Sequence, residues 1–351
     1  MLPLALIVQA QGHAISGSDR AFDQGRTPEK FDWLRQHGFA LFPQDGSGLT
    51  RSSQTVVATG AIETTVPDIG AARRIGARIV TRPELLSQIF NDADTAVGVA
   101  GTSGKSTITG MIAWILDQTG RNPTVMNGAV MNNFVSPDQP FASARIGDPG
   151  LFVAEVDESD GSIARYDPKV AVISNISLDH KSMDELRTLF AGFAVRARTA
   201  VLNIDNPETA SLADHLIRQG NVPAITTFGL NQGEASLSAI NLKPLATGMR
   251  FIVVERDGAT RTSARLAVPG AHNVANALAA IGAVQALGVG VAEAVAALAT
   301  FSGIRRRTEV VGKAAGVTVI DDFAHNPDKI TATLNTLHAF DGRLLILFQP
   351  H

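Results

Sequence analysis

The sequence predicts an α/β protein built around a mostly parallel sheet, and three observations support this fold class. Four apolar runs typical of buried parallel strands occur along the middle of the chain: "TAVGVA", "LFVAEVD", "KVAVISNI" and "TAVLNID". A segment with the apolar spacing of a helix follows the first of them. The chain has 351 residues, 45% of them hydrophobic, which is enough for two or three domains with large cores.

Residues 1–92 alternate short helices and strands, so we predict a small Rossmann-like domain. A secretory signal has basic residues before its apolar run, but the apolar run over 1–11 has none. We therefore expect a buried helix there. Strands are expected in "HAISGSD", "ALFP" and "TVVATGAI", and "ARIVTRPELLSQIF" continues the pattern. An opening strand before the first helix is missing, so we expect this domain to lack its first strand.

Residues 93–312 are predicted to form the central domain, whose main feature is "TAVGVAGTSGKSTITGM" (95–111). This stretch indicates a strand, a glycine loop and a helix. Glycines let backbone N–H groups approach a phosphate, the helix N-terminus adds positive potential, and Lys105 can reach terminal phosphates. Val99 occupies the place of the usual first glycine, so the strand–loop–helix context carries the interpretation. A plain glycine turn would not explain a lysine at the helix start.

In the remainder of the chain, the pattern of polar and apolar residues changes twice. Residues 235–268 alternate polar and apolar residues, which predicts an antiparallel patch, and two Ala-rich helices are expected over 273–287 and 291–299. Residues 313–351 restart a strand–helix–strand pattern. We interpret them as the beginning of a third, Rossmann-like α/β domain that is too short to close a core of its own.

Composition excludes several classes of function. A net charge of −3 argues against nucleic acid as the main partner, because phosphate backbones require a basic face. The absence of cysteine excludes disulfides, thiolate metal sites and cysteine nucleophiles, which fits a cytoplasmic protein. No apolar stretch approaches the roughly 20 residues of a membrane span, so no membrane association is expected.

Acidic residues follow one of the predicted strands. "AEVDESD" carries Glu155, Asp157, Glu158 and Asp160. Ligands of open α/β sheets bind at the carboxyl ends of the strands, and hard cations prefer oxygen ligands. One of these acids can therefore complete a Mg²⁺ site with Ser106, and Glu155 is the first choice because it follows the apolar run directly. A solvated acidic turn explains the same cluster about equally well.

Three further groups of polar residues have roles that the residues alone leave open. His180 follows Asn175 at another strand end, where a histidine is either a ligand or an ordinary surface residue. Asn273 and Asn276 lie one turn apart at a helix start, where amides can read a base edge or simply cap the helix. "GIRRRTE" and "DDFAHNP" add Arg307 and Asp322, and such Asp/His/Asn clusters before proline are common in turns.

In this order and spacing, the motifs resemble the Mur ligase family. They are "GTSGKST", "AEVDESDGS", "SNISLDH", "GAHNVANALAA", "FSGIRRRTE" and "IDDFAHNP", and together they span nearly the whole chain. "EVDESDGS" and the terminal "FQPH" are more similar to the alanine-adding branch than to the branch that recycles murein tripeptide. "AISGSD", "VVATGAI" and "TRPELL" are similar to the UDP-binding domain of the alanine-adding branch.

The resemblance implies an ATP-dependent amide ligase of peptidoglycan synthesis, which joins L-alanine to UDP-N-acetylmuramate. The muramoyl carboxylate would take the γ-phosphate of ATP, and the amine would attack the resulting acyl phosphate. The resemblance also implies a UDP-sugar-binding domain at 1–92, a P-loop ATPase domain at 93–312 and an incomplete amino-acid-binding domain at 313–351. Because most of this third domain is missing, we expect slow turnover, although the central domain can still bind ATP and Mg²⁺.

Residue by residue, the resemblance implies that Lys105 stabilises the transferred phosphoryl group. Ser106 and Glu155 would hold one Mg²⁺, and His180 a second. Asn273 and Asn276 would contact adenine, whereas Arg307 and Asp322 would contact the nucleotide when the domains close. The implied ATP-binding residues are Gly101, Thr102, Ser103, Gly104, Lys105, Ser106, Thr107, Asn273, Asn276, Arg307 and Asp322.

Two departures from the family pattern keep other interpretations open: the glycine-rich turn expected at the start of the first domain is absent, and the stretch after His180 is unusual. "KSMDELRTLFAGFA", after His180, differs from the usual continuation of the alanine-adding branch. Lys181 is not at the position of the carbamylated lysine of other branches, so it receives no such role. One alternative is a non-catalytic or divergent paralogue that binds nucleotide or UDP-sugar. Another is a generic P-loop phosphotransferase, which would have no use for UDP-sugars.

Overall fold

The computed structural model describes residues 1–59, 65–178, 180–220, 224–230, 233–245, 247–256, 258, 260–338, 340 and 342–349. The chain divides into two compact units, Met1–Ile89 and Phe90–His351, and each is described by itself. The predicted boundary between 312 and 313 falls inside strand β15 (Glu309–Ala314). The division into three functional domains stays a prediction.

The first unit contains short helices and two small parallel sheets, β1 with β2 and β3 with β4. The helix expected at the start is present, and Leu4 and Ile7 are buried on it. The last three residues of "VVATGAI" lie outside the described residues. The elements are α1 (Leu2–Ala10), β1 (Ser16–Gly17), α2 (Arg20–Asp23), α3 (Pro28–Gln36), β2 (Ala40–Leu41), β3 (Thr55–Ala58), α4 (Pro67–Ile75), β4 (Arg78–Thr81) and α5 (Arg82–Asn91), which ends in the second unit.

The second unit is organised by a ten-stranded sheet in the order β14-β13-β12-β11-β10-β9-β5-β8-β6-β7. Pairing is parallel from β12 through β6, so the predicted mostly parallel sheet is confirmed. The expected antiparallel patch is β12 to β14, which extends the same sheet. The strands are β5 (Thr95–Ala100), β6 (Pro123–Met126), β7 (Ala144–Arg145), β8 (Asp148–Glu155), β9 (Val170–Ile173), β10 (Thr199–Asn203), β11 (Ala224–Leu230), β12 (Leu237–Leu245), β13 (Gly248–Glu255) and β14 (Arg261–Leu266).

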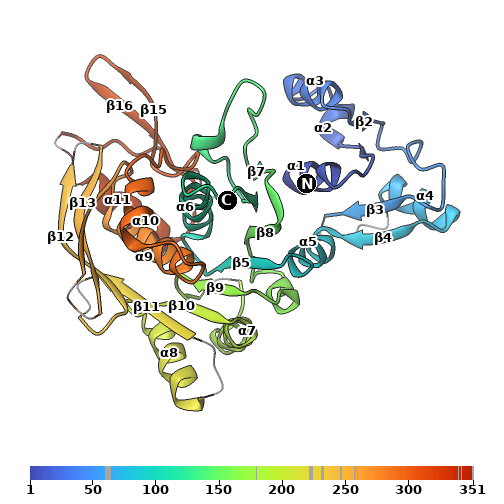
Figure 1. The fold of residues 1–351 in the computed structure, drawn as a ribbon. Helices are drawn as coiled ribbons and strands as arrows, with labels where there is room; N and C mark the ends of the chain where they lie inside the picture. The colour runs from blue at the N-terminus through green and yellow to red at the C-terminus, as the bar shows by residue number, and fades with distance from the viewer. Residues whose placement is uncertain are drawn as a thin grey trace. The chain divides into compact units, whose positions relative to one another are not determined.

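Helices cover both faces of this sheet: α6, α9 and α10 lie on one face, and α7 and α8 on the other (Figure 1). Alanine-rich α9 packs closely, and a Cβ at Gly282 would lie 2.9 Å from Val201 Cγ1 of β10. Ser182 and Glu185 form a capping box that starts α7. The helices are α6 (Lys105–Gln118), α7 (Met183–Arg196), α8 (Pro207–Gln219), α9 (Ala271–Gln285) and α10 (Val291–Leu298), with short 3₁₀ turns at Asn132–Phe134 and Ser162–Arg165.

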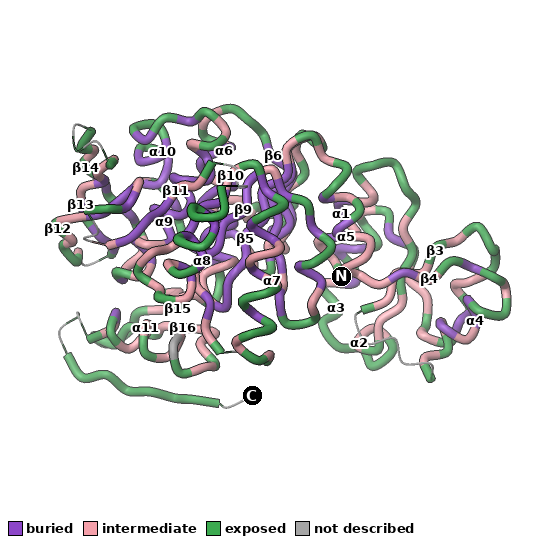
Figure 2. The backbone as a smooth tube through the Cα atoms, turned by 90° about the horizontal axis from the view of Figure 1, so that it is seen from below, coloured by how far each residue is buried: buried purple, intermediate pink, exposed green. Residues whose placement is uncertain are grey.

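The core of the second unit lies where the central strands meet α6 and α9. Figure 2 shows buried residues along β5, β9, β10 and α9. Val97 and Val99 of β5 and Ile108 and Met111 of α6 are fully buried in one cluster. These side chains hold the first turn of α6 against the end of β5, and they fix the loop between the two elements.

The last part of the chain differs from the predicted strand–helix–strand pattern. β15 pairs antiparallel with β16 (Val317–Asp321), and α11 (Pro327–Leu337) follows, but the strand expected at "RLLILF" is not formed within the described residues 342–349. Leu347 is fully exposed there. A strand requires a hydrogen-bonding neighbour, and apolar residues alone do not supply one.

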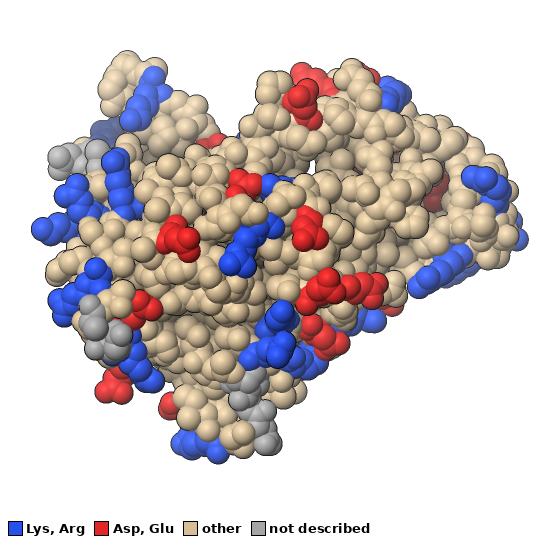
Figure 3. All heavy atoms as spheres, viewed as in Figure 1, with Lys and Arg blue, Asp and Glu red and all other residues tan. Residues whose placement is uncertain are grey.

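On the face drawn in Figure 3, lysine and arginine side chains are interspersed with aspartate and glutamate side chains. This face therefore presents mixed charge rather than one continuous basic surface. Among the described helices, none combines the length and the apolar character needed to cross a bilayer.

Candidate nucleotide-binding site

The loop between β5 and α6 has a backbone shape that only glycine fits at two positions. Gly101 has φ +131° and Gly104 has φ +85°, both in the left-handed range that favours glycine. A Cβ at Gly101 would lie 2.1 Å from Ser174 Oγ, and one at Gly104 would lie 2.7 Å from Asn276 Oδ1. Gly104 is the N-cap of α6 and has no side chain with which to cap the helix. The first backbone N–H groups of α6 are therefore well suited to bind an anion.

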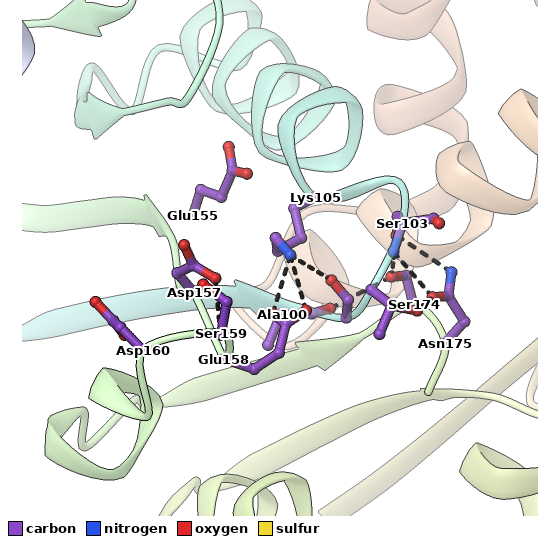
Figure 4. Close-up of polar contacts among 12 residues, drawn as sticks. Ala100, Ser103, Lys105, Glu155, Asp157, Glu158, Ser159, Asp160, Ser174 and Asn175 are labelled. Atoms are coloured by element: carbon purple, nitrogen blue, oxygen red, sulfur yellow. Dashed lines mark hydrogen bonds and ion pairs between the residues drawn. The ribbon is translucent and has the colours of Figure 1, made fainter. Parts of the chain in front are cut away.

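A polar network at the end of β9 holds this loop. Asn175 Oδ1 accepts hydrogen bonds from Thr102 Oγ1 at 2.5 Å and from Ser103 N at 2.9 Å, and its Nδ2 donates to Ser103 O at 3.2 Å. Ser174 Oγ also donates to Ser103 O, at 2.5 Å (Figure 4). Sequence reasoning noted Asn175 at a strand end without giving it a role. The structure shows that this side chain clamps the loop.

Lys105, the first residue of α6, is held by two groups. Its Nζ donates to Gly101 O at 2.7 Å and to Glu158 Oε2 and Oε1 at 2.9 and 3.2 Å (Figure 4). Glu158 is buried, and burial raises the pKa of its carboxyl group although the Lys105 ammonium opposes this shift. Sequence reasoning chose Glu155 from this acidic cluster and missed the contact of Glu158 with the lysine. Charge and spacing alone do not distinguish the acids of this cluster.

Ser106 and Glu155 meet on the other side of the helix start. Ser106 Oγ donates to Glu155 Oε2 at 2.9 Å, and the Gly128 N–H donates to the same oxygen at 2.9 Å. Asn127, which is buried, donates from Nδ2 to Ser106 O at 2.9 Å. The structure thus brings Lys105, Ser106 and Glu155 together. A hydroxyl and a carboxylate are oxygen donors of the kind that Mg²⁺ prefers, so these residues fit that ion.

His180 lies in the loop between β9 and α7 and is exposed, with φ +57°. The described part of the chain contains no group of three or more His, Asp or Glu side chains that could hold a metal ion. Mg²⁺ commonly uses one or two protein carboxylates and takes its other ligands from phosphate and water, so this finding is compatible with a site at Ser106 and Glu155. The role of His180 as a ligand stays a prediction.

The two asparagines of α9 do not cap their helix. Gly270 is the N-cap, and Asn273 lies three residues further on, so the capping interpretation is wrong. Both side chains are buried: Asn273 Nδ2 donates to Pro269 O at 2.7 Å, and Asn276 Nδ2 donates to Asn273 Oδ1 at 3.1 Å. Because Asn276 Oδ1 also lies close to Gly104, this pair borders the glycine loop. Contact with adenine stays a prediction.

Arg307 and Asp322 lie together in the same unit. Asp322 Oδ2 accepts from Thr308 N at 2.6 Å, and its Oδ1 accepts from Ala324 N at 2.8 Å. Burial lowers the pKa of the Arg307 guanidinium, and the negative charges of Asp322 and Glu155 oppose this shift. Asp322 thus holds the backbone next to Arg307, and contact of these two residues with the nucleotide stays a prediction.

A glycine loop at a helix start, a lysine beside it and a hydroxyl–carboxylate pair define an α/β protein of the phosphate-binding-loop class. Comparison with known families gives three matches: the Mur ligase family catalytic domain at residues 1–93, the Mur ligase middle domain at 99–284, and the Mur ligase glutamate ligase domain at 306–350. The chain belongs to the Mur ligase family, as its motifs predicted.

Individual relatives and solved structures agree with this assignment. The whole chain is 34% identical to the UDP-N-acetylmuramate–L-alanine ligase of Cereibacter sphaeroides and 35% identical to that of Streptomyces coelicolor, and it covers 73% and 74% of these proteins. The structure of the Thermotoga maritima UDP-N-acetylmuramate–alanine ligase matches 96% of the chain with a TM-score of 0.79 and 26% identity. The murein peptide ligase of Psychrobacter arcticus matches 97% with the same TM-score and 28% identity. The match covers 74% of the length of each of these two solved chains.

Proposed function

We propose that this protein is an ATP-dependent ligase that joins L-alanine to UDP-N-acetylmuramate through an acyl phosphate. The observation that carries the proposal is the convergence of Lys105, Ser106 and Glu155 at the glycine loop, with Ser106 Oγ 2.9 Å from Glu155 Oε2. Relatives that are about one-third identical over the whole chain are named for this reaction. We also propose that the reaction takes place in the cytoplasm, which the absence of cysteine fits.

The chemistry explains why such a site is needed. A carboxylate is a poor electrophile, and phosphorylation gives it a leaving group. A carboxylate oxygen of the sugar bonds to the γ-phosphorus as the bond to ADP breaks. The amine then bonds to the acyl carbon, phosphate leaves, and the amine loses a proton. The first step brings two anions together, and the Lys105 ammonium and the N–H groups of the loop offset their repulsion.

The Ser106 hydroxyl and the Glu155 carboxylate would hold Mg²⁺ beside the phosphates. When bound, this ion would neutralise part of the charge on the triphosphate. The hydrogen bond from Gly128 N–H keeps the Glu155 carboxylate turned toward Ser106. Asn175 and Ser174 hold the loop backbone in place, so that its N–H groups are oriented before the nucleotide arrives.

The test measures binding and turnover in parallel. Titrations with MgATP and with UDP-N-acetylmuramate give the two affinities. Phosphate release is then followed with ATP, UDP-N-acetylmuramate and L-alanine, and the amide product is identified by mass spectrometry. A parallel reaction with L-alanyl-γ-D-glutamyl-meso-diaminopimelate, the peptide named for a similar solved ligase, tests the alternative acceptor. We expect product with L-alanine and loss of phosphate release in Glu155→Ala and His180→Ala.

The outcomes separate the competing functions. Binding of both nucleotides without any phosphate release would favour a non-catalytic paralogue. Phosphate release that does not depend on UDP-N-acetylmuramate would favour a generic phosphotransferase. Failure to bind MgATP at all would contradict the proposal itself.

A further inference from the structure

The acid that contacts Lys105 is not one of the residues assigned above to the reaction. Lys105 and Glu158 form an ion pair of 2.9 Å in which their side chains are only 16% and 5% exposed. Glu158 lies in the turn after β8, three residues beyond Glu155, and points back toward the glycine loop (Figure 4). A buried carboxylate is costly unless a cation and hydrogen bonds compensate it, and Lys105 supplies both. The ion pair between Lys105 and Glu158 is therefore a structural part of the glycine loop.

The same pair occupies the donors that a phosphate would use. An ammonium group has three N–H donors. Gly101 O accepts one at 2.7 Å, and the two oxygens of Glu158 lie at 2.9 and 3.2 Å on the remaining side. A lysine at this position of a phosphate-binding loop reaches the β- and γ-phosphates. A phosphate oxygen must therefore replace a Glu158 oxygen, at least in part, when nucleotide binds.

We propose that Glu158 is an internal counter-ion that occupies the place of phosphate beside Lys105 and competes with the nucleotide for it. The proposal rests on the proposed function, because it requires that ATP binds at this loop. Glu158 keeps the lysine extended and neutralised while the loop is empty. Its negative charge then lowers the affinity for both ATP and ADP, because it stays close to the phosphates after Lys105 has turned to them.

Substitution of Glu158 by glutamine tests whether Glu158 competes with the nucleotide for Lys105 or only supports the lysine side chain. Glu158→Gln keeps the size of the side chain and one oxygen that accepts from Lys105, but it removes the charge. We expect Glu158→Gln to bind MgADP and MgATP about tenfold more tightly than the wild type, because the carboxylate no longer competes for the ammonium group. Isothermal titration of the 351-residue chain measures both affinities.

Asp160→Asn is the matched control. Asp160 lies in the same acidic turn but is exposed, and its Oδ1 accepts from Ser162 N at 2.8 Å, a bond that asparagine preserves. The control therefore loses the same charge close by without touching Lys105, and its affinities should stay within about twofold of the wild type, as expected for a screened surface charge. Unchanged or weaker nucleotide binding in Glu158→Gln would overturn the proposal, and so would equal tightening in Asp160→Asn.

A second measurement does not depend on the variant being folded. A structure of the wild-type protein with a non-hydrolysable ATP analogue should show Lys105 Nζ on a phosphate oxygen, with the 2.9 Å contact to Glu158 Oε2 lengthened beyond hydrogen-bonding distance. Retention of this contact with phosphate bound nearby would overturn the competition. Absence of any nucleotide binding to the wild type would instead count against the proposed function, so the two failures are distinguishable.

Discussion

Asn175 provides a direct test of how the glycine loop is held ready for phosphate. In Asn175→Ala, Thr102 Oγ1 and Ser103 N each lose their acceptor. The 3.2 Å bond from Asn175 Nδ2 to Ser103 O is lost too, although Ser103 O keeps its bond from Ser174 Oγ. Each of the bonds from Thr102 Oγ1 and Ser103 N is worth about 1 kcal/mol net, and the third bond adds little because Ser103 O stays hydrogen-bonded to Ser174. If the bound nucleotide has to reorder the loop, the loss of about 2 kcal/mol corresponds to MgATP binding that is weaker by up to about 30-fold.

Calorimetric titration with MgATP and urea unfolding of the same samples measure the two effects of Asn175→Ala separately. Asn203→Ala is the matched control: Asn203 lies at the end of β10, donates to Ser174 O at 2.8 Å and accepts from Asp205 N at 2.9 Å. Asn203→Ala therefore loses two hydrogen bonds, and neither of them involves the glycine loop. We expect similar destabilisation in both variants and weakened nucleotide binding only in Asn175→Ala. Equal affinities in the two variants would refute the role of Asn175 as a clamp.

Two further predictions concern the neighbours of the site. In Gly128→Ala a Cβ would lie 2.6 Å from Glu155 Oε2, so the carboxylate should be displaced. MgATP binding should then require more Mg²⁺. A titration of Mg²⁺ at fixed ATP measures this, and an unchanged midpoint would contradict it. Burial lowers the pKa of His272, against an opposing effect of Asp322, so the unfolded chain binds a proton more readily than the folded one. Stability should therefore fall as pH drops below the ordinary histidine value of about 6.5, and His272→Gln should flatten the slope of unfolding free energy between pH 7 and 5.

The parts of the site that are local in the chain were predictable from the sequence. The strand, the glycine loop and the first turn of α6 follow one another within 95–111, and their order alone identifies the phosphate-binding loop. The contact of Ser106 with Glu155 was also expected, because parallel strands end at one edge of a sheet. In the structure Val99 of β5 is in register with Glu155 of β8, which puts that carboxylate beside the loop.

The parts that depend on burial or on exact boundaries were not predictable. Glu158 differs from its acidic neighbours only because the turn after β8 buries it against Lys105. Asn273 was a candidate cap because the expected helix began at that residue, whereas α9 begins at Ala271. The strand expected within 342–349 failed for a related reason, since an apolar run predicts a strand only where a neighbour exists to pair with it.

The two glutamates at and after the end of β8 show why charge alone does not define the role of a residue. Each glutamate holds one residue of the helix start: Glu155 accepts from the Ser106 hydroxyl, and Glu158 pairs with the Lys105 ammonium. An incoming MgATP would bring a cation to Glu155, so this carboxylate gains a partner. It would bring only phosphate to Lys105, so the ion pair between Glu158 and Lys105 would be weakened. Removal of the same unit charge three residues apart should therefore change nucleotide affinity in opposite directions, weaker for Glu155 and tighter for Glu158.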